Sequence, residues 1–322
     1  MPTYDKSILT EQARRLGFIT SSFEKMMRLT EILRFLNESD ELRKSLALKG
    51  GTAINLTMID LPRLSVDIDM DFTLNLGREE TRAIRDKIES LLALYMAAEG
   101  YTKSARSKRT HILDSFVYSY TSITGYPENM KVEINYSLRS HVLSTVDVAV
   151  RTAEVFTLFQ IRTLAPVEIF ASKIVALSDR AAVRDLYDLN NMIYYNLFSE
   201  PDIILLRKCA VFYKAVAGDT TSQGFDFKRI DDITPYRIRT ELRPMIRNVE
   251  RFDLQAARDR VSAFIDEWMI LTENESSFLK HFRAGRYEPH LLFDDSEIVK
   301  RIENHPMAQW RLQRKREGQA ER

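Results

Sequence analysis

The sequence predicts an α+β fold, in which a mixed β-sheet core with flanking helices is followed by a mainly helical domain. Runs with the alternating pattern of strands are concentrated before residue 140, whereas helical periodicity dominates from residue 166 onward. A length of 322 residues is enough for two domains. We therefore expect a sheet domain with an N-terminal helix at residues 1–150 and a helical domain at residues 151–322.

The composition is that of an ordinary globular protein, with 44% hydrophobic and 29% charged residues. Lys and Arg number 47 against 46 Asp and Glu, so any nucleic-acid surface must be a local patch. The single cysteine, Cys209, excludes an intramolecular disulfide and a cysteine-based zinc site. The first residues contain no apolar signal region and no later run approaches ~20 apolar residues, so we expect a cytoplasmic protein with no membrane partner.

Helices and strands alternate in the first part of the chain. Apolar residues at helical spacing predict a helix over residues 22–37, with Ser21 as N-cap and Glu24 completing a capping box. A longer helix with one apolar face is expected over residues 78–98, and Gly100 ends it. Three strand-like runs follow, at Tyr101–Ser107, Ser115–Thr121 and Lys131–Ser137.

Two consecutive glycines, Gly50 and Gly51, follow a short apolar run. Glycine reaches backbone angles closed to other residues, and it leaves no side chain between the backbone and a bound phosphate. The next segment, residues 52–58, is expected to begin a helix whose free N–H groups favour an anion. This stretch therefore predicts a turn that binds phosphate groups.

Residues 67–72 alternate strictly between acidic and apolar side chains, which predicts a strand. The carboxylates of Asp67, Asp69 and Asp71 then share one face and repel one another unless a cation lies between them. Mg²⁺ prefers such hard oxygen ligands and keeps positions open for substrate phosphates, and Mn²⁺ accepts the same ligands. The alternative is an edge strand with a solvated acidic face. The glycine turn ahead of the strand favours the metal site.

A further carboxylate, Glu133, lies between apolar neighbours in the run over residues 131–137. A carboxylate on a central strand is costly without a partner, and a metal shared with Asp67 and Asp69 would supply one. The alternative is an edge strand on which Glu133 pairs with a surface lysine. We favour the metal interpretation.

Pro166 begins a second informative stretch, because proline suits the first turn of a helix. This helix carries Lys173, which we expect to be exposed, and Arg180 on the same face. A second helix carries three charged residues, Arg184, Asp185 and Asp188. The alternative to a functional cluster is a salt-bridged hairpin in which the two aspartates pair with the two arginines, and both interpretations can hold together. Further helices are expected near residues 202–216, 252–271 and 274–284.

A resemblance to a known family lies in the run Lys49-Gly50-Gly51-Thr52, followed by Arg63-x-Ser65-x-Asp67-x-Asp69. This pattern resembles the AbiEii-type nucleotidyltransferase toxins of bacterial type IV toxin–antitoxin systems. That family is similar to the DNA polymerase β-type nucleotidyltransferases, whose signature is a Gly-Gly or Gly-Ser turn followed by Asp-x-Asp. The stretch from Pro166 to Asp188 resembles the same family. The resemblance spans residues 45–195 and implies a nucleotidyltransferase-like sheet core.

The resemblance implies a reaction in which a nucleoside monophosphate passes from an NTP to an acceptor and pyrophosphate is released. Asp67, Asp69 and Glu133 would hold Mg²⁺ or Mn²⁺, and Glu133 would help to deprotonate the attacking hydroxyl. Lys173 would contact the nucleotide phosphates, and Asp188 would position Lys173 or the acceptor. The other nucleotide-binding residues would be Lys49, Gly50, Gly51, Thr52, Ser65 and Arg180.

By the same resemblance, the acceptor would be the 3′ end of tRNA or another RNA, a cognate antitoxin would be a partner, and the system would act in phage defence. Two basic stretches, Lys103–His111 and the tail Arg311–Arg316, would either contact RNA or be solvated, and we expect the tail to be mobile. A protein-modifying nucleotidyltransferase and a non-catalytic nucleotide-binding regulator are the alternatives. Paired metal carboxylates together with Lys173 argue against the regulator. The sequence does not indicate which NTP is used.

Overall fold

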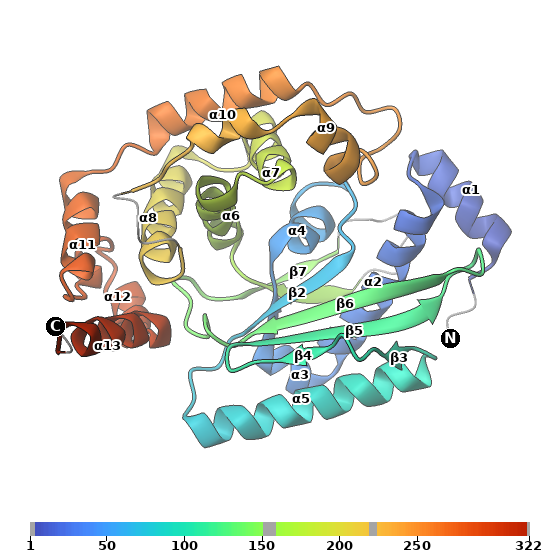
Figure 1. The fold of residues 1–322 in the computed structure, drawn as a ribbon, viewed down its shortest axis with the longest axis horizontal. Coiled ribbons are helices and arrows are strands. Elements are labelled where there is room, and N and C mark those ends of the chain that lie inside the picture. The colour runs from blue at the N-terminus through green and yellow to red at the C-terminus, as the bar shows by residue number, and fades with distance from the viewer. Residues whose placement is uncertain (1–3, 151–158, 219–223, 321–322) are drawn as a thin grey trace. The chain divides into compact units, whose positions relative to one another are not determined.

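The computed structural model describes residues 4–150, 159–218 and 224–320, and the chain divides into two compact units (Figure 1). The sheet unit comprises Met1–Arg139, Thr145–Leu164 and Arg243–Glu250. The helical unit comprises Ser140–Ser144, Ala165–Leu242 and Arg251–Arg322. A boundary between folding domains at residue 150 stays a prediction.

The sheet unit is built on one mixed sheet with the strand order β3-β5-β6-β2-β1-β8-β7, and β4 pairs with β5. Its described strands are β1 (Leu46–Leu48), β2 (Asp67–Phe72), β3 (Thr102–Lys103), β4 (Lys108–Arg109), β5 (Leu113–Thr121), β6 (Pro127–Asn135), β7 (Val146–Ala149) and β8 (Gln160–Thr163). Its helices are α1 (Lys6–Leu16), α2 (Thr20–Glu38), α3 (Asp40–Ser45), α4 (Gly50–Ala53) and α5 (Arg78–Ala98). The pairs β2–β6 and β1–β8 are parallel, and the other pairs are antiparallel. The predicted mixed α+β fold is confirmed.

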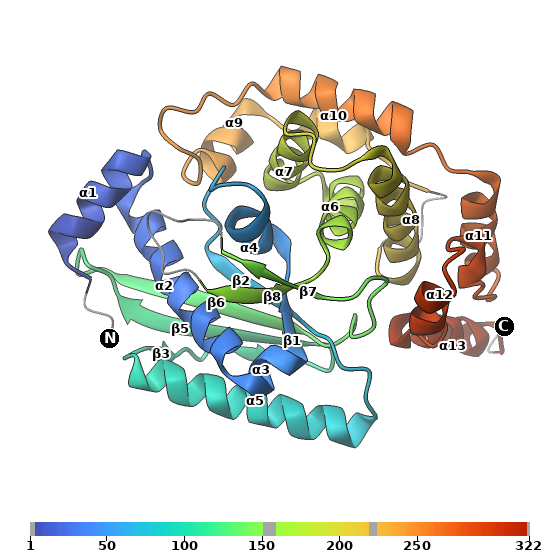
Figure 2. The same ribbon diagram turned by 180° about the vertical axis from the view of Figure 1, so that it is seen from behind.

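The two faces of the central strands differ in polarity because side chains alternate along each strand. On one face, Ile68, Met70, Val132, Ile134 and Phe116 are buried. Helices α2 and α3 lie on one side of the sheet, as Figure 2 shows, and α2 packs on α5 through the stacked rings of Phe35 and Tyr95, 4.0 Å apart. The opposite face carries Asp67, Asp69 and Asp71 of β2 and, from β6, Lys131 and Glu133.

Most predicted elements of this unit lie where the periodicity placed them. Helix α5 spans Arg78–Ala98 as predicted, and β2 spans Asp67–Phe72. The run predicted over residues 101–107 is interrupted, because the chain leaves the sheet after β3 and rejoins the same edge of β5 as β4. Strand β6 begins at Pro127, before the predicted start, and both β7 and β8 were not predicted. Strands of four residues are too short to show a clear alternation.

The capping box predicted at Ser21 and Glu24 is wrong. Helix α2 begins at Thr20, and Glu24 is 1% exposed inside the sheet unit. Its carboxylate accepts a hydrogen bond from Arg28 Nε at 2.8 Å and from the backbone N–H of Ile123 at 3.1 Å. The guanidinium of Arg28 also lies over the ring of Tyr120, 4.4 Å from its centroid. This buried pair ties α2 to the end of β5.

The helical unit is built from the helices α6 to α13. In both views α6 lies between α7 and α8 (Figures 1 and 2). The helices predicted near residues 202–216, 252–271 and 274–284 are confirmed as α8, α10 and α11. The helices are α6 (Pro166–Arg180), α7 (Val183–Tyr194), α8 (Glu200–Val216), α9 (Pro235–Arg237), α10 (Leu254–Trp268), α11 (Glu273–Arg283), α12 (Ser296–Ile302) and α13 (Pro306–Ala320).

The basic stretch Arg311–Arg316 is not the mobile tail that the sequence predicts, because it lies within α13. Arg311 donates hydrogen bonds to the carbonyl oxygens of Ala215 and Gly218, at 3.0 and 2.9 Å. Lys315 donates to the carbonyl oxygen of Phe282 at 3.3 Å, so two of its charges hold the helix in place. Across the described residues, no helix is both long and apolar enough to cross a membrane.

The contribution of the buried Glu24–Arg28 pair to the stability of the sheet unit can be measured. Arg28→Met should lower the free energy of unfolding by about 3–5 kcal/mol, because Glu24 then stays buried without its cation. Urea unfolding followed by circular dichroism measures the change. Arg14 is the control, since it forms a similar pair with Glu11 in which the side chains are 75% and 62% exposed. Arg14→Met should leave the unfolding midpoint unchanged, and equal losses in both variants would contradict this account.

Candidate active site

The Gly-Gly turn lies against the acidic strand. Gly50 has a φ of +68°, which glycine adopts without strain, and a Cβ at this position would lie 3.2 Å from Asp69 Oδ2. The backbone N–H of Lys49 donates to the carbonyl oxygen of Asp69 at 2.9 Å. The Asp69 carboxylate therefore lies against Gly50, and only glycine lets the turn approach the carboxylate so closely.

The second glycine of the turn covers a buried arginine. A Cβ on Gly51 would lie 2.3 Å from Arg63 Nη2, so any larger residue would displace the guanidinium. Arg63 is 2% exposed, and its Nη1 donates to the carbonyl oxygen of Leu64 at 3.1 Å. Its backbone pairs with Ile246. Arg63 is not among the predicted site residues, although it lies in the motif Arg63-x-Ser65-x-Asp67-x-Asp69.

The segment that follows the turn holds it to β2. Thr52 Oγ1 donates to the backbone carbonyl of Asp67 at 2.6 Å. The helix predicted over residues 52–58 forms in part, as the four-residue α4 and a π-helical turn at Ile54–Met58. Ser65 is half-buried just before β2, and the side chain of Asp67 is half-exposed.

The parallel pairing of β2 with β6 brings the predicted acids together. Asp67 lies opposite Lys131 and Asp69 lies opposite Glu133, so these side chains share one face of the sheet. Both strands are central, because β2 lies between β1 and β6 and β6 lies between β2 and β5. The alternative of an edge strand is therefore wrong for both. The lysine pairing that this alternative included is present, since Glu133 Oε1 lies 2.9 Å from Lys131 Nζ.

A cavity opens on this face. It has a volume of about 230 Å³, and its walls include Lys49, Asp69 and Glu133. Lys49 Nζ pairs with Asp71 Oδ1 at 2.6 Å, and Asp71 is only 2% exposed. Asp71 is thus a buried partner of Lys49, whereas Asp69 and Glu133 border the open space.

The donor set fits a hard divalent cation. Asp67 and Asp69 offer carboxylate oxygens from one strand face, and Glu133 offers another from the adjacent strand. In the described part of the chain, no three His, Cys, Asp or Glu side chains gather closely enough to hold a metal by themselves. The predicted set of Asp67, Asp69 and Glu133 is therefore not assembled as a three-carboxylate metal site among the described residues. Mg²⁺ can be held by one or two protein carboxylates, because substrate phosphates complete its coordination.

The charge of Lys131 is stabilised by the same acids. Burial by itself would lower the pKa of the Lys131 ammonium group. The hydrogen bond to Glu133 and the negative charges of Glu133, Asp67 and Asp69 outweigh burial, so the pKa of Lys131 is raised. The ammonium group therefore lies in the field of all three carboxylates that the sequence predicts as metal ligands.

The helical unit contains the second predicted cluster, on α6 and α7. Lys173 Nζ lies 2.8 Å from Asp185 Oδ1 and 2.8 Å from Asp188 Oδ2. Both aspartate side chains are 1% exposed and that of Lys173 is 12% exposed, so the expectation of an exposed lysine is wrong. Arg180 is 66% exposed and pairs with Asp185 at 2.9 Å, as the hairpin interpretation predicts. Arg184 is exposed, and Asp188 pairs with Lys173 on the neighbouring helix.

Comparison with known proteins decides the family. The model of the family described as nucleotidyl transferase AbiEii toxin, type IV TA system, matches residues 34–284. The chain belongs to the AbiEii toxin family. It is a nucleotidyltransferase, as the sequence resemblance predicted. No curated protein sequence matches this chain.

Solved structures give the fold of this AbiEii-family chain independent support. The structure of MenT4, nucleotidyltransferase toxin Rv2826c from Mycobacterium tuberculosis H37Rv, superposes with a TM-score of 0.63 at 17% identity, covering 88% of this chain and 97% of that one. An antigenic nucleotidyltransferase-like protein from Paracoccidioides brasiliensis also matches, at 14% identity over 83% of this chain and 96% of that one, with a TM-score of 0.35. The first match shows that the fold is shared.

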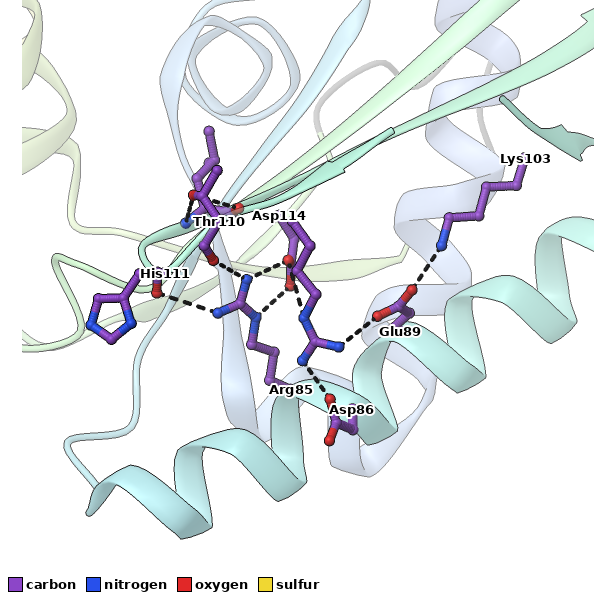
Figure 3. Close-up of polar contacts among 9 residues, drawn as sticks. Arg85, Asp86, Glu89, Lys103, Thr110, His111 and Asp114 are labelled. Carbon is purple, nitrogen blue, oxygen red and sulfur yellow. Dashed lines mark hydrogen bonds and ion pairs between the residues drawn. The ribbon is translucent and has the colours of Figure 1, made fainter. Parts of the chain in front are cut away.

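The basic stretch Lys103–His111 of this AbiEii-family chain faces acidic residues of α5 (Figure 3). Arg109 pairs with Asp86 and, at 3.0 Å, with Glu89, and Lys103 Nζ pairs with Glu89 at 2.7 Å. Asp114, which is fully buried, accepts two hydrogen bonds from Arg85 of α5. Much of the positive charge in this stretch is therefore neutralised within the sheet unit. Arg106 and Lys108 are exposed.

Two aspartates on the same strand face should respond differently to substitution. Asp67→Asn should leave the unfolding temperature nearly unchanged, because Asp67 is half-exposed. If Asp67 is a metal ligand, as the sequence predicts, the variant should weaken Mg²⁺-dependent NTP binding by about 100-fold or more. Asp71→Asn should lower the unfolding temperature, because it breaks the buried pair with Lys49, and should preserve the Mg²⁺ dependence. Isothermal titration with NTP, with and without Mg²⁺, measures both variants. An unchanged Mg²⁺ response in Asp67→Asn would remove Asp67 from the metal site.

The cluster on α6 and α7 should behave as one electrostatic unit. Lys173→Met should lower the free energy of unfolding by about 3–5 kcal/mol, because two buried carboxylates lose a shared cation. Adding Asp188→Asn should recover part of this loss, since one buried charge is removed. Denaturant unfolding of the two single variants and the double variant gives the coupling energy. Additive losses would show that the two residues do not depend on each other.

Proposed function

We propose that this chain transfers a nucleoside monophosphate from an NTP to an RNA acceptor, in a reaction that depends on Mg²⁺ or Mn²⁺. The observation that carries the proposal is the Asp69 carboxylate, which rests on the Gly50 turn and borders the cavity lined by Glu133 and Lys49. A phosphate-binding turn and a metal-binding carboxylate are thereby neighbours in one unit. The AbiEii family membership supports the same reaction.

The glycine turn would bind the phosphates of the nucleotide, and strand β2 would bind the divalent cation. Gly50, Gly51 and Thr52 would present backbone N–H groups to the triphosphate, with Ser65 and Lys49 beside them. Asp67 and Asp69 would hold the divalent cation, and Glu133 would complete the set. When bound, the cation neutralises the charge that develops on the triphosphate oxygens.

Two further roles are proposed from chemistry and family resemblance. Glu133 would accept the proton of the attacking hydroxyl, which requires that it release Lys131. Lys173 would neutralise the nucleotide phosphates, with Asp185 and Asp188 fixing the direction of its ammonium group through two contacts of 2.8 Å. By the same resemblance, Arg180, which is 66% exposed and pairs with Asp185, would contact the nucleotide.

The nature of the acceptor is the least constrained part of the proposal. Family resemblance favours the 3′ end of tRNA, and Arg106 and Lys108 are exposed cations that suit a phosphate backbone. A protein acceptor is the second candidate, because the rest of the basic stretch is paired with acids of α5. We also propose a cytoplasmic location, a cognate antitoxin and a role in phage defence, all three from the family.

Labelled nucleotides separate these acceptors. The purified protein is incubated with each of four α-³²P-labelled NTPs and Mg²⁺, together with total RNA, total protein, or RNA whose 3′ diol has been oxidised with periodate. We expect label in RNA, none in oxidised RNA, and none with Asp67→Asn or without a divalent cation. Arg106→Gln with Lys108→Gln should reduce RNA labelling and flatten its salt dependence.

The outcomes decide between the two acceptors. Label in protein but never in RNA, whichever NTP is offered, would replace the RNA acceptor with a protein side chain. Label in periodate-oxidised RNA would show that the 3′ hydroxyl is not the nucleophile. Undiminished labelling in the presence of a chelator would overturn the dependence on a divalent cation.

A further inference from the structure

Lys131 lies on the face of the sheet that carries Asp67, Asp69 and Glu133. It is not among the residues to which a role in substrate or metal binding has been given. It lies on β6 opposite Asp67 and two residues before Glu133, so its side chain is on the same face as the three proposed metal ligands. Its Nζ lies 2.9 Å from Glu133 Oε1. The residue is on a central strand, which fixes its backbone firmly relative to the acids.

The carboxylates of this face repel one another in the absence of a cation. Asp67 and Asp69 are two residues apart on one strand, and Glu133 lies beside Asp69 on the next strand. Like charges at such spacing destabilise the folded state unless an opposite charge compensates them. Lys131 supplies that opposite charge from within the sheet.

We propose that Lys131 is a built-in counter-ion of the metal site, which neutralises the carboxylates in the metal-free protein and competes with a divalent cation for them. This inference rests on the proposed function. The Lys131 ammonium group and a bound cation would compete for the negative charge of Glu133 Oε1, because both are positive and close to the same oxygen. Binding of the cation therefore weakens the 2.9 Å contact between Lys131 and Glu133.

The competition has a consequence for the order of binding. A divalent cation alone gains few ligands here and must displace an ammonium group, so its affinity is low. A cation that arrives with an NTP brings phosphate oxygens as further ligands, and the phosphates offer the displaced ammonium group a new partner. Lys131 thus makes the site selective for the metal–nucleotide complex over the free metal ion.

The test measures binding of Mn²⁺ alone, in the absence of nucleotide. Free Mn²⁺ is followed by electron paramagnetic resonance in titrations of the wild type, Lys131→Met and Lys131→Gln, and the unfolding temperature is recorded with and without Mn²⁺. We expect both variants to bind Mn²⁺ about tenfold more tightly or better than the wild type, because a competing charge a few ångströms away is removed. Without metal they should unfold at a lower temperature, and Mn²⁺ should raise that temperature by more than in the wild type.

Lys103 is a closely matched control. Its side chain is 41% exposed, as is that of Lys131, and it pairs at 2.7 Å with Glu89, whose side chain is 26% exposed against 24% for Glu133. Lys103→Met removes the same charge from the same unit, away from the proposed metal ligands, and should leave Mn²⁺ affinity unchanged. Equal tightening in Lys103→Met would show a general charge effect and overturn the inference.

The result separates this inference from the proposed function. If Asp67→Asn abolishes Mn²⁺ binding while both Lys131 variants bind as the wild type does, the metal site stands and the inference fails. Weaker binding in the Lys131 variants would also overturn it, because Lys131 would then support the site. If neither the wild type nor the variants bind Mn²⁺ without nucleotide, the inference fails, and the metal site is then decided by the titration with NTP in the presence and absence of Mg²⁺. Absence of nucleotide transfer with Mn²⁺ binding intact would overturn the reaction alone.

Discussion

The parallel pairing of β2 with β6 is the constraint on which the acidic face depends. Because paired residues on adjacent strands project to the same side, this single register places Asp69 beside Glu133 and Asp67 beside Lys131. A shift of one residue would turn the acids of one strand into the apolar layer beneath α2. The apolar residues on the other face, Ile68 and Val132 among them, fix the register, because only one alignment of the two strands keeps them buried. Packing on one face thus determines the chemistry of the other.

Local patterns predicted much of this arrangement and for a physical reason. The alternation over residues 67–72 and the long apolar stripe of α5 are periodic over enough residues to identify a strand and a helix. The glycine turn was visible because only glycine tolerates the φ of Gly50 and the approach of Asp69. These features are recorded in residues that are neighbours in the sequence, so the sequence alone reveals them.

Contacts between distant residues were not predictable in this way. Glu24 has the spacing of a helix cap, yet it binds Arg28 and the backbone of Ile123, 99 residues away. Lys173 has the composition of an exposed helical residue, yet α7 folds back so that two buried carboxylates enclose it. Arg63 shows no periodic signal at all, and its position beneath Gly51 is known only from the fold. In these cases burial, or a partner from another part of the chain, determines the role of the charge, and the local pattern shows neither.

The path of the chain between the two units has a consequence for synthesis and for truncation. The chain passes between the units five times, and Arg243–Glu250 returns to the sheet unit after about half of the helical unit has been made. Leu64, beside Arg63 and the glycine turn, donates its backbone N–H to Met245 at 2.7 Å within that returning segment. Neither unit is therefore encoded by one continuous stretch of the gene. The ribosome must translate residue 250 before all segments of the sheet unit exist. A chain interrupted earlier lacks the backbone hydrogen bond from Leu64 to Met245, so the support beside the Gly50–Gly51 turn is completed only in the last quarter of translation.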